Sequence, residues 1–107
     1  IGMAYIVIGC VKTDPDPLQR AVALYAGYAA VAPLSESERS VLAVLVAGRL
    51  ATSVTMGAYS LSKDPGNDYL KLHAEPGWEA LELVLEADPA VFIGRCEAAR
   101  AALCEAN

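Results

Sequence analysis

Hydrophobic positions recur at helical spacing along most of the chain. After Pro17, one face of the expected helix carries Leu18, Val22, Tyr25 and Ala29, which is typical of an amphipathic helix that buries one stripe. Asp16 followed by Pro17 is the pattern of an N-cap residue with proline at the first helical position. Pro33 stops the segment. We therefore predict a helix from Pro17 to about Ala32, capped by the Asp16 side chain.

A second and longer helix is expected after Pro33. Ser35 and Glu38 have the spacing of a capping box, and the helical pattern then continues to Leu61 or Ser62. From Val41 to Ala47 this segment is apolar all round, which predicts a central, buried helix. Gly48 and Gly57 lie in its interior, where glycine costs about 1 kcal/mol. We expect a neighbouring helix to approach closely at these two glycines and so offset that cost.

The second half of the chain predicts two more helices. A strong turn runs from Lys63 to Asp68, and residues 69–75 are ambiguous. Pro76 is expected to open a helix that ends near Ala87, with a buried stripe formed by Trp78, Leu81 and Leu85. Asp88 and Pro89 repeat the device of a cap followed by proline. The helix after Pro89 has on one face Phe92, Cys96, Ala99 and Leu103.

The first segment is the exception to this pattern. Ala4 to Val11 is rich in β-branched residues and favours a buried strand by propensity. The chain predicts no second strand, and one strand makes no sheet, so we predict a helix here too. The fold expected is all-α, about five helices in a small bundle, with residues 1–107 forming a single helical subdomain.

Composition excludes some classes of protein. Of 107 residues, 55% are hydrophobic and 20% are charged, whereas intrinsic disorder needs the opposite balance. The net charge is −5 and the eight basic residues are scattered, which disfavours nucleic acid and anionic membrane surfaces as partners. No uninterrupted apolar run reaches the roughly 18–20 residues that span a bilayer, so we expect no membrane partner.

The three cysteines lack the spacing of a metal site. If one helix holds Cys96 and Cys104, about 12 Å separate them, which is too far for a disulfide. We expect Cys10, Cys96 and Cys104 to be reduced, buried residues of a cytoplasmic protein.

Two other candidate sites favour structural roles. Asp14 and Asp16 each precede a proline, so capping is favoured over metal binding. His73 is the only histidine, and a lone histidine favours a surface or turn position over catalysis. We therefore predict no catalytic and no metal-ligating residue. The acidic stripe Glu75, Glu79, Glu82 and Glu86 favours a solvated face, with a basic partner as the alternative.

Several segments resemble one family in order and spacing. They are Gly2 to Tyr5, Asp16 to Leu18 leading to Ala26-Gly27-Tyr28, Pro33 to Glu38, Gly48 to Thr55, and Asn67 to Leu72 leading to Pro76-Gly77-Trp78 and Leu81. Together they resemble the C-terminal helical part of aminoglycoside phosphotransferase-like kinases, in particular the hydroxylysine-kinase type and phosphotransferase domains fused to class III aminotransferases. The chain departs from that pattern at His73-Ala74, where the family often has Ser-Glu, and at Gly77, where it often has Ala.

The resemblance implies a fragment of a small-molecule kinase acting on amino-compounds. The ATP-binding lobe and the catalytic loop would lie before Ile1, together with the groups that hold Mg²⁺ and the nucleoside triphosphate. This chain would then hold no cofactor of its own, brace the catalytic lobe, help wall the acceptor pocket, and be inactive alone. The partner expected is the missing kinase lobe. The alternative is a stand-alone helical interaction module that forms a homodimer through its apolar first helix.

Arg49 is the first candidate for that pocket wall, because it interrupts the most apolar segment. Ser53 lies on the same helical stripe one turn later. A guanidinium in an apolar setting needs a carboxylate or carbonyl partner. That partner is either the acceptor's carboxylate or an Asp or Glu of a neighbouring helix. Tyr69 and Trp78, which flank Pro76, are further candidates for substrate binding, with a place in the core as the alternative for Trp78.

Overall fold

The chain is folded entirely from helices, as the sequence predicts. The computed structural model describes residues 1–106. These residues form the helices α1 (Gly2–Cys10), α2 (Leu18–Val31), α3 (Glu36–Lys63), α4 (Asp68–Glu86) and α5 (Pro89–Ala106). The β-branched first segment is helical, and no strand occurs within residues 1–106. The predicted all-α bundle of about five helices is confirmed.

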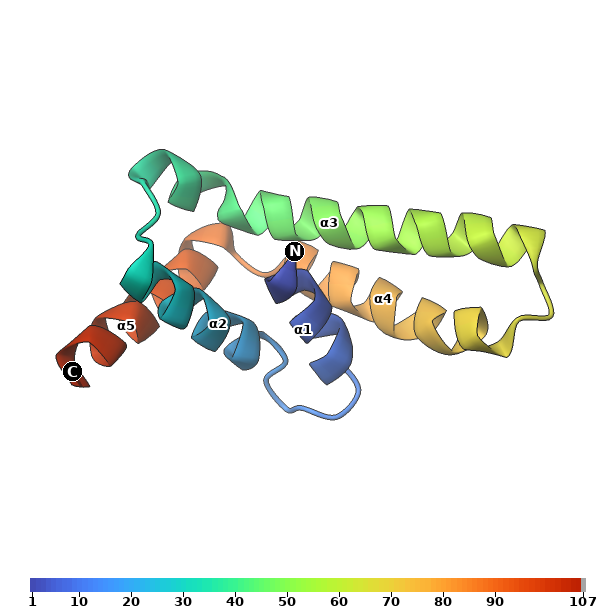
Figure 1. Ribbon diagram of the computed structural model, residues 1–107, viewed down its shortest axis with the longest axis horizontal. Coiled ribbons are helices and arrows are strands. Elements are labelled where there is room, and N and C mark those ends of the chain that lie inside the picture. The colour runs from blue at the N-terminus through green and yellow to red at the C-terminus, as the bar shows by residue number, and fades with distance from the viewer. Residues whose placement is uncertain (107) are drawn as a thin grey trace.

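Two helix pairs and a central helix make up the bundle (Figure 1). The long α3 runs along one side and α4 returns beside it, so that the two form an antiparallel hairpin. At the opposite end α2 packs against α5. The short α1 lies between the pairs and packs against α2, α3 and α4. The molecule is elongated, with extents of 51 × 27 × 24 Å.

The core is where the two pairs meet α1. Its largest fully buried side chains are Leu50 of α3, Val7 of α1 and Cys96 of α5. The face predicted for α2 is confirmed, since all four of its residues are buried. The central position of α1 follows from its burial, because Met3, Ala4, Val7 and Cys10 all point into the protein.

Two of the predicted helix starts have the expected caps. The Glu38 amide donates to the Ser35 hydroxyl at 3.2 Å, and the Ser35 amide donates to the Glu38 carboxylate at 2.8 Å, so the capping box is confirmed. This carboxylate accepts from the Ser35 amide, which lowers the pKa of Glu38. At the start of α5 the Asp88 carboxylate accepts from the Ala90 amide at 2.8 Å.

The predicted capping role of Asp16 is wrong. Helix α2 begins at Leu18, and Pro17 stands at its N-cap with a helical backbone and no side-chain cap bond. The Asp16 carboxylate instead accepts from Arg95 Nη2 on α5 at 2.6 Å. Arg95 on the neighbouring helix thus engages the carboxylate that was expected to cap α2. This ion pair ties the start of α2 to α5.

Pro76 lies inside a helix and does not begin one. Helix α4 starts at Asp68, where the Leu70 amide donates to the Asn67 side chain at 3.2 Å. Proline at position 76 removes the amide that would bond the carbonyl of Leu72, and Leu72 lies at the surface, where water can reach it.

The buried stripe of α4 also differs from the prediction. It consists of Gly77, Ala80, Leu81 and Val84, while Trp78 and Leu85 are exposed. The predicted stripe assumes a helix that begins at Pro76 and buries its bulkiest side chains. The packing instead uses small residues, because α3 lies close to this face of α4.

Helix α3 is not the central helix that its composition predicts. Only Val46, Leu50 and Val54 of α3 are buried, whereas Val41, Val44 and Leu45 are 45%, 67% and 61% exposed. The reason is that the other described helices cover one side of α3 and leave the opposite side open (Figure 1). The apolar segment of α3 therefore predicted burial correctly for only one face of this helix.

The predicted close approaches at Gly48 and Gly57 are also wrong. A Cβ atom at either position would meet nothing within 4 Å. The tight contacts are at Gly2 against Leu24 and at Gly77 against Val54. Glycine therefore permits close packing of α1 on α2 and of α4 on α3, and not at the middle of α3.

The cysteines divide into two classes. Cys10 and Cys96 are buried, Cys104 is exposed, and all three are free thiols. The prediction that all three are buried is therefore wrong for Cys104, because the last turns of α5 extend beyond α2. Burial raises the pKa of Cys96 to about 11, which keeps that thiol protonated and unreactive at neutral pH.

Candidate functional site

A small polar cluster bridges α3 and α1. Arg49 of α3 donates from Nη2 to the Tyr5 hydroxyl of α1 at 2.7 Å, and its Cζ atom lies 5.5 Å from the centre of the Tyr5 ring. Ser53, one turn further along α3, also lowers the pKa of the Tyr5 hydroxyl. The structure thus brings together two of the predicted site residues, Arg49 and Ser53, and adds Tyr5.

Arg49 differs from every other basic residue in residues 1–106. Five basic residues form ion pairs with carboxylates: Lys12, Arg20, Arg39, Arg95 and Arg100. Lys63 and Lys71 lie exposed in water. Arg49 is partly buried, has no carboxylate within 4.0 Å among the described residues, and its Nε atom is buried without a hydrogen-bond partner. The salt bridge considered as an alternative for Arg49 is therefore not formed with any described residue.

The cluster changes the acidity of the phenol. Arg49 lowers the pKa of Tyr5, first by hydrogen bonding to the phenol oxygen and then by its positive charge, and Ser53 adds a smaller effect. Because its oxygen accepts from Arg49, the Tyr5 hydroxyl still has its own proton to donate. Tyr5 is 51% exposed, so a ligand can reach that proton from solvent.

The sequence alone does not predict a role for Tyr5 in this cluster. The available signal was that Tyr5 is the only hydroxyl-bearing residue in residues 1–12, in an otherwise apolar segment. Its contact with Arg49 joins positions 44 residues apart, and no local pattern reports such a pairing.

The other two predicted site residues lie in different places. Tyr69 is in the first turn of α4, exposed, with its ring 4.5 Å from the His73 ring. Trp78 lies nine residues later, or about 13 Å along the helix axis. Trp78 is 50% exposed and follows Gly77, which touches Val54, the neighbour of Ser53. Trp78 of α4 therefore lies beside the part of α3 that carries Ser53, whereas Tyr69 lies towards the turn of the hairpin. Substrate binding by all four residues stays a prediction.

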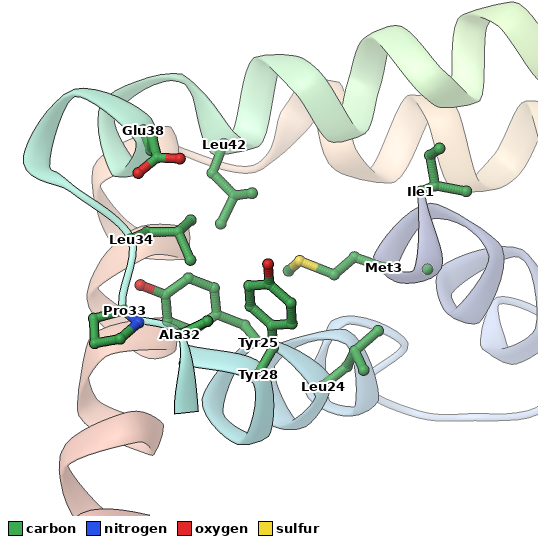
Figure 2. A pocket seen from close by; sticks show the side chains of 11 residues that line it. Ile1, Met3, Leu24, Tyr25, Tyr28, Ala32, Pro33, Leu34, Glu38 and Leu42 are labelled. Atoms are coloured by element: carbon green, nitrogen blue, oxygen red, sulfur yellow. The ribbon is translucent and has the colours of Figure 1, made fainter. Parts of the chain in front are cut away.

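A cleft of the protein lies away from this cluster (Figure 2). It has a volume of about 540 Å³ and is bounded by the start of α1, the second half of α2 and the start of α3. Its polar groups include Tyr25, whose hydroxyl donates to Glu97, and Glu38, whose carboxylate belongs to the capping box. Both groups serve the fold, and the remaining lining is mainly apolar.

The predicted acidic stripe borders a second cleft, lined by Glu79, Glu82 and Glu86 together with the turn after α1. Lys12 at this turn forms ion pairs with Glu75 and Glu79. The nearest basic partner of the stripe is therefore in the same chain. Within residues 1–106, no group of three or more His, Cys, Asp or Glu side chains is placed to hold a metal ion.

One described helix is long and apolar enough to cross a membrane. It is α3, in which an 18-residue window reaches a mean hydropathy of 1.7 and is 17% buried within the structure. No uninterrupted apolar run predicted this, because Arg49 interrupts the segment. Length and composition alone do not separate a membrane span from a helix with a protein partner. Most of this apolar window of α3 is therefore not covered by the other described helices.

Comparison with known proteins gives one consistent result. Over 85 residues the chain is 32% identical to hydroxylysine kinase of Mus musculus, a match that covers 78% of this chain and 23% of that protein. Hydroxylysine kinases of Xenopus laevis and Bos taurus are 37% and 35% identical over 68 and 71 residues. This chain is similar to part of three hydroxylysine kinases. The similarity supports a relationship to kinase-like phosphotransferases.

The match is partial with respect to the relatives. It spans 18–23% of the length of these three kinases, so most of each relative has no counterpart in this chain. No family model matches the sequence, and no solved structure matches it.

Proposed function

We propose that this chain is the C-terminal helical part of a small-molecule kinase that phosphorylates an amino-compound. It supports the catalytic lobe, forms one wall of the acceptor pocket, and has no activity alone. The observation that carries the proposal is the similarity to three hydroxylysine kinases over about a fifth of their length. Hydroxylysine is accordingly the first acceptor to test.

The open face of α3 supports the role as a brace. Val41, Val44 and Leu45 are exposed on a helix whose other face is buried. Contiguous exposed apolar residues of this kind mark interaction surfaces. In the proposed enzyme this face packs against the catalytic lobe.

Phosphoryl transfer needs groups that position magnesium and the phosphates and a residue that orients the attacking hydroxyl. The described residues offer no cluster of ligands for a metal ion. In the proposed enzyme those groups therefore belong to the catalytic lobe, and this chain contributes only to binding and orientation of the acceptor. No chemical step is assigned to its side chains.

The first test is to read the coding sequence on the 5′ side of the Ile1 codon and to express the complete product. We expect an in-frame kinase lobe, and ATP-dependent phosphorylation of hydroxylysine that mass spectrometry detects as a phosphorylated product. The 107-residue chain alone should produce none. A complete product that has no kinase lobe, or that phosphorylates no amino-compound, would disprove the proposal.

The same exposed face supports a second candidate function, a helical module that self-associates. The sequence predicts this contact on the first helix, but four residues of α1 are buried inside the protomer. The available apolar surface is on α3. If the chain works alone, we therefore expect its dimer contact to centre on Val44.

Light scattering separates the two candidates. A self-associating module should be dimeric at high micromolar concentration both as the 107-residue chain and within any longer product, and Val44→Glu should make it monomeric. The kinase proposal expects a complete product in which α3 is covered, so that Val44→Glu lowers its stability and does not change its oligomeric state.

A further inference from the structure

The polar cluster of Tyr5, Arg49 and Ser53 has the chemistry of a binding site for a single negative charge. Arg49 is the only partly buried cation in residues 1–106 without a carboxylate partner. Taking a guanidinium out of water without an opposite charge is unfavourable. Its buried Nε atom adds an unsatisfied donor, which costs free energy of its own. An anion bound beside the guanidinium would supply the missing opposite charge.

The hydroxyl groups beside Arg49 are suited to the same task. The Tyr5 oxygen already accepts from Arg49, so its proton is directed to another acceptor. The positive charge behind the phenol makes this proton a stronger donor. Ser53, one turn from Arg49 on α3, supplies a second hydroxyl on the same helical stripe. Donors from α1 and α3 thus converge from two rigid helices, which favours a defined geometry.

The charge at the cluster favours a carboxylate over a phosphate group. One guanidinium balances one carboxylate, whereas a phosphate that carries about two charges is typically held by several basic groups. The other basic residues are engaged in their own ion pairs, or lie exposed at Lys63 and Lys71. The planar fork of arginine also matches the two oxygens of a carboxylate.

We propose that Arg49, with the hydroxyls of Tyr5 and Ser53, binds the carboxylate of the acceptor substrate. This inference rests on the proposed function, because it places the acceptor between this face of α1 and α3 and the catalytic lobe. It makes the enzyme selective for amino acids over the corresponding amines. Arg49 is a binding residue in this proposal, and Tyr5 a second donor that Arg49 positions.

The test uses the complete polypeptide and two acceptors, hydroxylysine and its decarboxylated analogue, which keeps both amines and the hydroxyl. Loss of one charge-assisted interaction of this type corresponds to roughly a 10- to 100-fold change in binding. We expect Arg49→Gln to raise KM for hydroxylysine by about that factor and to change KM for the analogue less than about twofold. Arg49→Lys keeps the charge, so its KM for hydroxylysine should lie between those of the wild type and Arg49→Gln. Tyr5→Phe should show a smaller loss of the same selectivity.

Lys63→Gln is the matched control, since it removes a positive charge from the same helix at an exposed position. It should leave KM for both acceptors unchanged. As an independent readout, ultraviolet titration of the phenols should show that the pKa of Tyr5 rises in Arg49→Gln, with Tyr5→Phe identifying the signal.

Each outcome separates the two proposals. If the wild-type enzyme phosphorylates both acceptors with equal KM, or if Arg49→Gln affects both acceptors equally, the carboxylate site is wrong while the kinase function stands. If Arg49→Gln affects both acceptors equally and also lowers stability, Arg49 forms an ion pair with an acidic side chain of the catalytic lobe. If the complete product phosphorylates neither acceptor, the proposed function fails and the carboxylate site fails with it.

Discussion

Gly77 of α4 lies so close to Val54 of α3 that a Cβ atom at position 77 would come within 3.1 Å of Val54 Cγ1. The two arms of the hairpin approach each other closely at this contact. Val54 is buried and β-branched, so its side chain has little freedom to move aside within a helix.

Gly77→Val should therefore destabilise the protein. The added methyl groups overpack the contact, and such changes typically cost about 1–3 kcal/mol. Urea unfolding followed by circular dichroism measures the loss. A free energy of unfolding equal to that of the wild type would show that α4 can move away from α3 without cost.

Alanine at Gly48 and Gly57 should have the opposite effect. Both positions are helical with nothing within 4 Å of an added Cβ atom, and alanine favours a helix over glycine by about 1 kcal/mol. We expect each substitution to stabilise the 107-residue chain by about 0.5–1 kcal/mol in the same assay. Gly77→Val serves as the contrasting variant, and a loss of stability in either alanine variant would contradict the open environment of these glycines.

Leu50→Ala tests the position of the core. Leu50 is fully buried where α3 meets the rest of the bundle, and leucine-to-alanine changes at such sites cost about 2–5 kcal/mol. Thermal or urea unfolding should show this loss. Leu45→Ala, on the exposed face of the same helix, is the control and should change the stability of the 107-residue chain by less than about 0.5 kcal/mol.

Tyr25 should make stability depend on alkaline pH. Its hydroxyl donates to Glu97, and burial followed by this carboxylate raises the pKa of Tyr25 from 10.0 to about 12. The folded protein therefore holds the phenol proton more tightly than the unfolded chain. The resulting stabilisation is complete below pH 10 and is lost as the pH rises towards 12.

Unfolding measured from pH 8 to 12 in wild type and in Tyr25→Phe isolates this effect. The difference in free energy of unfolding between the two proteins should be constant below pH 10 and shrink above it. A difference that stays constant up to pH 12 would contradict the raised pKa.

Replacing Asp16 or Asp88 by alanine should lower stability by different amounts and with different salt dependence, although both residues precede a proline. Asp88 caps α5 through the Ala90 amide, so Asp88→Ala should cost about 1 kcal/mol at any salt concentration. Asp16 forms a partly exposed ion pair with Arg95, so Asp16→Ala should cost less than about 1 kcal/mol, and that cost should shrink in 1 M salt. Equal, salt-independent losses would mean that Asp16 also acts as a cap.

Much of the helical organisation could be predicted locally. The capping box at Ser35, the cap at Asp88 and the buried face of α2 depend on residues within one or two turns of each other. Sequence reasoning failed where the deciding partner was distant. Asp16 binds Arg95 on α5, and Pro76 is carried inside a helix that packs on α3.

The candidate site divides in the same way. Arg49 and Ser53 could be identified from their place in an apolar helix, because a charge at such a position needs a partner. The partner of Arg49 could not be identified in this way. Tyr5 belongs to another helix, and no local sequence pattern links the two residues.

The sequence by itself determined that this chain is helical and where most helices begin and end, because helix propensity, caps and turns are set by neighbours along the chain. Tertiary structure alone decided which faces are covered. It left one side of α3 open, placed small residues and not Trp78 at the contact between α3 and α4, and joined Arg49 to Tyr5. The physical reason is that burial and charge pairing depend on which helices meet in space, and the local pattern of a helix does not contain that information.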